Sequence, residues 1–164
     1  MVALLTALSK WLAATSLSHV IQTTGWVIPT LQTIHILCVA VLFSSAVLVD
    51  LRLLRLLQRD VPLPDVARRF LPPIWPVLVV LLVTGSLLIV GEPHRSLINV
   101  TFYLKMGLLL AGILVTALLQ RSFAAAPAYW QRPRAVGQLA AVASLVIWCG
   151  VLFAGRWIAY TQAG

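Results

Sequence analysis

The sequence is poor in charged residues. Only 10% of its 164 residues are Asp, Glu, Lys or Arg, whereas 61% are hydrophobic. A soluble domain carries about 25% charged residues, so this composition leaves too few polar side chains to cover a surface that faces water. It excludes a soluble enzyme, a disordered chain and a secreted module built on disulfides. The sequence therefore predicts a protein of the lipid bilayer.

Acidic residues and reactive motifs are also scarce. Four Asp and Glu stand against twelve Lys and Arg, but most of the arginine lies in two short stretches between apolar runs. That pattern orients membrane proteins, so no nucleic-acid partner is expected. Cys38 and Cys149 lie in apolar segments without redox or metal spacing and are expected to be buried thiols. No phosphate loop, zinc-protease motif, carboxylate pair or serine triad is present, so no enzyme activity is indicated.

Four apolar runs have the length of a membrane span, for which a helix needs roughly 20 residues. They cover about residues 26–49, 72–90, 102–119 and 136–157. Backbone groups in lipid must find their hydrogen bonds within the protein, and the alternation typical of barrel strands is absent. We therefore expect an all-α fold, an integral membrane four-helix bundle over residues 26–164.

Residues 1–25 are expected to form an interfacial amphipathic segment before the bundle. Apolar residues recur there at helical spacing, at Leu4, Leu8, Trp11 and Leu12, with Ser9 and Lys10 on the other side. This pattern predicts a short helix that lies on the outer leaflet. The more polar stretch from Thr15 to Thr24 is expected to be a loop or a second short turn.

The distribution of Lys and Arg predicts the orientation of the spans. The two connections expected on one side carry Arg52, Arg55, Arg59, Arg68, Arg69, Arg121, Arg132 and Arg134, and the other side carries Lys10, Arg95, Lys105 and Arg156. The positive-inside rule places both arginine-rich connections in the cytoplasm and both termini outside. At the end of the first span, Asp50 is expected to pair with Arg52, Arg55 or a basic residue of the second connection. The leucines that follow predict that this helix continues along the inner surface.

Small residues recur four apart on the third and fourth spans, for example Gly107 with Ala111 and Gly137 with Ala141. Such pairs allow close packing of helices, either within the bundle or across a homodimer. The expected partners are therefore the lipid bilayer and either other membrane subunits or a second copy of the chain. Residues 84–86 give the second span a weakly polar middle, which is typical of a segment that satisfies a neighbouring backbone.

Ionisable residues inside a membrane are functional candidates. His35 lies nine residues after Trp26, or roughly 13 Å below the outer interface at 1.5 Å per residue. Gln32 lies one turn from His35 on the same face. Lys105 and Met106 lie about one turn inside the third span, and Arg156 lies at the outer end of the fourth. The topology is expected to gather Gln32, His35, Lys105 and Arg156 in the outer half of the bundle, with Met106 next to Lys105.

These residue types fit a cofactor site. A neutral histidine binds haem iron or another metal, or relays a proton, and His35 could also bind a quinone carbonyl. Lys105 and Arg156 could hold an anionic group such as a haem propionate, and Met106 is the nearby sulfur ligand. The spans hold a single histidine, however, and the same residues could bind neighbouring helices or extend to the headgroups. The leading hypothesis is a small redox or electron-transfer component that binds haem b or quinone. The alternative is a non-catalytic subunit that assembles with or stabilises a larger membrane complex.

The order of several residues resembles a known family. It comprises Trp26, Pro29, Gln32 and His35, then Asp50-Leu51-Arg52-Leu53-Leu54, then Asn99, Phe102 and Lys105, and finally Gly155-Arg156. This order is similar to that of a family of small bacterial membrane proteins classed as a domain of unknown function. The resemblance spans about residues 26–160 and implies a four-helix protein of the bacterial inner membrane, without an activity. The family often has an acidic residue where this chain has Gln32 and a glycine where it has Arg55.

Overall fold

The protein is described by a computed structural model over residues 2–57, 60–131, 135–158 and 160. Its long helices are α3 (Val27–Leu53), α5 (Ile74–Gly91), α7 (Val100–Ala125) and α8 (Ala135–Trp157), and the short α4 (Leu63–Phe70) precedes α5. The described residues contain no strand. Four helices are long and apolar enough to cross a membrane, with α4 and α5 counted as one. The predicted all-α membrane bundle is confirmed at this level. Arg59, Arg132 and Arg134 lie outside the described residues.

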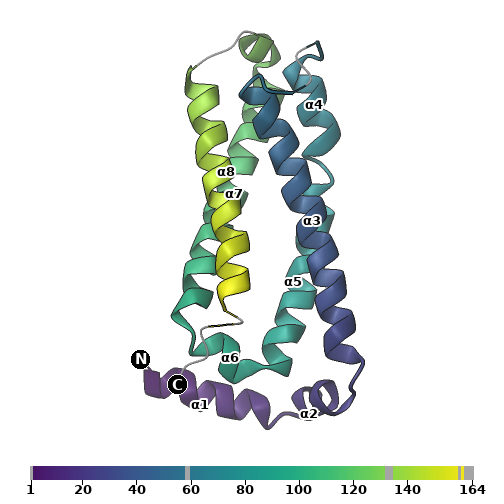
Figure 1. Ribbon diagram of the computed structural model, residues 1–164, viewed down its shortest axis with the longest axis vertical. Helices are drawn as coiled ribbons and strands as arrows, with labels where there is room; N and C mark the ends of the chain where they lie inside the picture. Colours follow the sequence, from purple (N-terminus) through teal and green to yellow (C-terminus); the bar gives the residue numbers. More distant parts are fainter. Residues whose placement is uncertain (1, 58–59, 132–134, 159, 161–164) are drawn as a thin grey trace.

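The short elements lie at the two ends of the bundle (Figure 1). At one end are α1 (Val2–Ala13), α2 (Ser16–Thr23) and α6 (Pro93–Leu97), next to the last turn of α8. We call this the foot end. At the other end lie the connection from α3 to α4 and η1 (Pro127–Gln131). We call this the arginine end, because Arg52, Arg55, Arg68, Arg69 and Arg121 lie there.

The bundle consists of two hairpins that pack most closely at the arginine end. In the first hairpin α3 packs on α5, in the second α7 packs on α8, and α3 also contacts α8. The apolar core of these helices begins at Leu42 on α3 and includes Leu119 and Phe123 on α7 and Ala141 and Trp148 on α8. In the described chain, no residue of α3 before Leu42 and none of α7 before Gly112 is fully buried. On α3 and α7, full burial is therefore confined to the half of each helix toward the arginine end.

Local hydrogen bonds end α3 at Leu53, before the last of the leucines that were expected to continue the helix. Arg55 has a positive φ of 61°, the amide of Leu56 donates to the carbonyl of Leu51, and the amide of Arg55 donates to that of Arg52. These two bonds and the left-handed residue form a Schellman motif, which stops a helix. The prediction that this helix continues along the inner surface is therefore wrong.

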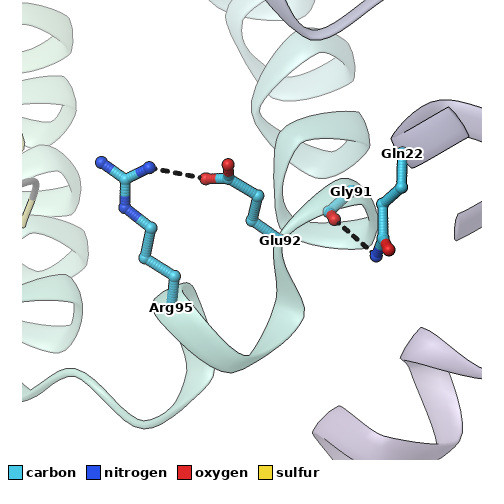
Figure 2. A network of polar contacts seen from close by, with 4 residues as sticks. All are labelled: Gln22, Gly91, Glu92 and Arg95. Atoms are coloured by element: carbon cyan, nitrogen blue, oxygen red, sulfur yellow. Dashed lines mark hydrogen bonds and ion pairs between the residues drawn. The ribbon is translucent and has the colours of Figure 1, made fainter. Parts of the chain in front are cut away.

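The foot is formed by α1 and α2, and it is hydrogen-bonded to the first hairpin. The Ser18 hydroxyl donates to the carbonyl of Val90 at 2.7 Å, and the Gln22 amide donates to that of Gly91 at 2.9 Å. Figure 2 shows the second bond beside the ion pair of Glu92 and Arg95, which measures 2.7 Å. The stretch expected to be a loop or turn is thus an eight-residue helix, α2. It is held by contacts between segments about 70 residues apart in the sequence.

Candidate functional site

His35 is bound to the neighbouring helix α5. Its Nδ1 lies 2.8 Å from Oγ1 of Thr84, a residue that is buried. The Thr84 hydroxyl also donates to the carbonyl of Val80 at 2.8 Å. A threonine hydroxyl has a single hydrogen. Because the carbonyl takes that hydrogen, Nδ1 must carry its own hydrogen and donate it to Thr84. The neutral imidazole then has its lone pair on Nε2.

A glycine allows the imidazole to lie close to α5. A Cβ added at Gly85 would be 3.4 Å from Cε1 of His35, so the ring lies within one side-chain carbon of this turn. Thr84, in the polar middle of the second span, thus forms hydrogen bonds with both His35 and the backbone of its own helix. Thr84 was not among the predicted site residues. Its signal in the sequence, a threonine next to a glycine in an apolar run, fits ordinary helix packing equally well.

Lys105 comes from the second hairpin. Its side chain lies against α8, where a Cβ at Gly155 would be 3.6 Å from both Cε and Nζ of Lys105. Lys105 on α7 and His35 on α3 both lie in the half of the bundle toward the foot end. The two hairpins therefore contribute one nitrogen base and one basic side chain to the half of the bundle in which α3 and α7 have no fully buried residue.

The other predicted site residues have no bond to His35 among the described side chains. Gln32 is exposed one turn from His35, and Met106 is half-buried next to Lys105. Arg156 is exposed, donates from Nη2 to the Tyr160 hydroxyl at 2.6 Å, and places its guanidinium 5.0 Å from the centre of that ring. Arg156 is thus bound within its own C-terminal segment. Across the described residues, no hydrogen bond or ion pair joins these three side chains to His35.

The chemistry available at His35 is that of a single nitrogen ligand. The other histidines, His19 and His94, are exposed at the foot end. Within the described ranges, no group of three or more His, Cys, Asp or Glu is placed to hold a metal ion, and Cys38 and Cys149 are free and half-buried. The Nε2 lone pair can ligate an iron whose remaining ligands belong to a macrocycle, or accept a hydrogen from a hydroxyl.

Asp50 does not have the surroundings that were expected. It is 2% exposed, and its carboxyl is hydrogen-bonded to Ser144 on α8. The guanidinium of Arg52 donates from Nε and Nη2 to the carbonyl of Val61, at 2.9 and 2.7 Å. The predicted pairing of Asp50 with an arginine is not found among the described residues. Its position at the end of an apolar run resembled that of a solvated helix end, which concealed its burial.

Comparisons with known proteins give a family and no activity. A family model described as "Family of unknown function (DUF6644)" matches residues 8–161, which include both His35 and Asp50. No curated protein and no solved structure matches the chain. Because the matched region covers nearly all of the sequence, the chain belongs to this family of unknown function.

Proposed function

We propose that this protein is a small redox or electron-transfer component of the bacterial inner membrane, and that it binds haem b or a quinone near the foot end. The observation that supports this proposal is the bond from Nδ1 of His35 to Thr84, together with the bond from Thr84 to the carbonyl of Val80. A protein uses such a bond to fix the tautomer and the ring orientation of a histidine ligand. His35 is thereby held with Nε2 available to a ligand.

The tautomer favours some ligands over others. An Nε2 lone pair suits the iron of haem b, and it also suits the hydroxyl hydrogen of a quinol, the reduced form of a quinone. The carbonyl of an oxidised quinone has no hydrogen to give and would need an N–H from His35. Thr84 would then have to turn its hydroxyl from the carbonyl of Val80 to Nδ1. We therefore expect haem or quinol to be preferred.

The charges near His35 agree with a cofactor that carries acidic groups. Lys105 lies on the opposite hairpin, and a haem propionate or another anion would be stabilised by its ammonium group. Electron transfer also needs donors and acceptors, so the proposal includes partner subunits in the membrane. In the orientation proposed from the arginine count, the arginine end faces the cytoplasm and the foot end faces outside.

The test is the optical spectrum of the detergent-purified protein, oxidised and then reduced with dithionite, together with the quinone content of a solvent extract. The protein should come from cells that make both cofactors. His35→Ala is the test variant, and His94→Ala is the matched control because His94 is exposed. We expect a haem spectrum or a stoichiometric quinone in the wild type and in His94→Ala, and its loss in His35→Ala.

The opposite result would be a spectrum of tryptophan alone and an extract without quinone. The redox proposal would then fail, and the alternative, a non-catalytic subunit of a larger membrane complex, would take its place. In that case His35→Ala should only remove an interhelical hydrogen bond. Such bonds in membrane bundles contribute about 0.6–1.7 kcal/mol to stability.

A further inference from the structure

A second buried polar cluster lies toward the arginine end, away from His35. It comprises Asp50 on α3, Thr116 on α7, and Ser144 and Trp148 on α8, each no more than 3% exposed. The Asp50 carboxyl is hydrogen-bonded to Ser144, so it faces α8. Most other buried residues around these helices are apolar.

Two atoms of this cluster have unused hydrogen-bonding capacity. Oδ2 of Asp50 and Nε1 of Trp148 are buried and have no hydrogen-bond partner within the described part of the chain. Ser144 and Trp148 are one turn apart on the same face of α8. The indole ring is held against α7, because a Cβ at Gly112 would be 3.0 Å from its Cζ2 atom. The unpaired acceptor of Asp50 and the unpaired donor of Trp148 thus belong to the same buried cluster.

The register of α7 against α8 brings Thr116 to the same level. Gly112 contacts Trp148, Gly150 contacts Leu108, and Gly155 contacts Lys105. In this antiparallel register Thr116 lies opposite Ser144. The carboxylate of Asp50 and the hydroxyls of Ser144 and Thr116 therefore come from three helices to one depth of the bundle. Carboxylate and hydroxyl oxygens are ligands for hard cations.

The cationic side chains near Asp50 are directed elsewhere. Arg52, on the same helix, donates to the carbonyl of Val61. The other ionisable residues described on the elements packed around the cluster are either exposed or half-buried. Those exposed are Asp65, Arg68 and Arg69 on α4, Tyr103 and Arg121 on α7, Tyr129 on η1 and Arg156 on α8, and those half-buried are His35 and Cys38 on α3, Lys105 on α7 and Cys149 on α8. Arg132 and Arg134 lie outside the described residues. No ion pair to Asp50 is found among the described side chains.

A buried carboxylate without a counter-charge is strongly unfavourable in a low-dielectric interior, and in membrane bundles such residues mark ion or proton sites. We propose that Asp50, Ser144 and Thr116 form a binding site for a small monovalent cation, either a proton or an alkali-metal ion, between α3, α7 and α8. A water molecule bound with the cation would accept the hydrogen of the Trp148 indole. This site is independent of any cofactor at His35.

The test measures ion binding to the purified full-length protein. Binding of radioactive sodium is titrated at several pH values, and infrared difference spectra between acid and alkali detect the C=O stretch of a protonated carboxyl. The test variant is Asp50→Asn, and Asp65→Asn is the control because Asp65 is an exposed carboxylate on the neighbouring α4. Ser144→Ala provides a second variant that keeps the carboxylate. It should weaken sodium binding about tenfold, as expected for one bond to a charged group.

Two outcomes support the proposal, and they distinguish the ions. Saturable sodium binding in wild type and Asp65→Asn but not in Asp50→Asn would identify an alkali-metal site. An infrared carboxyl band that is lost only in Asp50→Asn, without sodium binding, would identify a proton site. If Asp50→Asn does not fold, Ser144→Ala becomes the test variant. A changed sodium affinity or a shifted carboxyl band in Ser144→Ala would then support the proposal. The proposal would be overturned if the wild-type protein bound no sodium and also showed no titrating carboxyl band assigned to Asp50.

Discussion

Gly91 is the residue at which a single methyl group should separate the foot from the bundle. A Cβ at this position would lie 2.8 Å from Cγ2 of Ile21. Ile21 is buried on α2, and its Cγ2 is attached directly to Cβ, so rotation about the end of a long side chain cannot relieve the clash. Gly91→Ala should therefore move α2 as a unit.

The size of the effect can be worked out from the contacts. Ordinary contact begins at 3.4 Å, so α2 must move by at least about 0.6 Å. The same movement would lengthen the bonds of Ser18 and Gln22 from 2.7 and 2.9 Å to about 3.3 and 3.5 Å, at the limit for a hydrogen bond. Overpacking costs about 1–3 kcal/mol and each weakened bond up to about 1 kcal/mol. The free energy of unfolding should fall by about 2–4 kcal/mol.

The measurement is the unfolding free energy in mixed micelles, together with the rate of trypsin cleavage after Lys10, an exposed residue of α1. Gly107→Ala is the matched control, because a Cβ at Gly107 meets no atom within 4 Å. We expect faster cleavage and lower stability for Gly91→Ala alone. Equal stability and equal cleavage in the two variants would show that the foot is not docked as described.

Three further predictions concern single contacts. Thr84→Val removes the hydrogen-bond partner of His35 and should lower the free energy of unfolding by about 0.6–1.7 kcal/mol. It should also weaken the binding of any cofactor at His35. An unchanged spectrum and an unchanged melting curve would contradict the role of Thr84. Trp75→Phe removes a 2.7 Å bond to Gln120, which links α5 to α7, and chemical unfolding should show a loss of about 0.5–1.5 kcal/mol. Arg55→Gly should raise stability by about 0.5–1 kcal/mol in the same assay, because glycine adopts the positive φ of this position without a steric cost. A loss of stability there would mean that the Arg55 side chain contributes more than its backbone costs.

Much of the fold could be predicted because a membrane span depends mainly on length and hydropathy. The apolar runs locate all four long helices, but α3 and α7 extend beyond them, to Leu53 and Ala125. Hydropathy detects the part of a helix that suits lipid, whereas a helix continues wherever backbone bonds and packing support it. The position of α2 could not be predicted, because it depends on bonds to Val90 and Gly91.

The candidate site was only partly predictable for the same reason. His35 stands out because histidine is rare in an apolar span, but its bond to Thr84 depends on the register of α3 against α5. The partner of Asp50, Ser144, lies 94 residues away in the sequence. Arg52 and Arg55 are much closer to Asp50 in the sequence. A prediction from the pattern of charges alone would therefore always select one of them as its partner. Which side chains meet across helices is decided by packing, which a hydropathy pattern does not contain.

The docking of the foot has a consequence for biosynthesis. The segment that forms α1 and α2 leaves the ribosome earlier than Val90 and Gly91, whose carbonyls hold α2 at the end of the second long apolar segment. The foot therefore has no binding site until the first hairpin has been synthesised and inserted. Until then its apolar residues must stay in contact with the membrane surface or the insertion machinery. Closure of the foot end is thus a late step of assembly, although the foot precedes the first hairpin in the sequence.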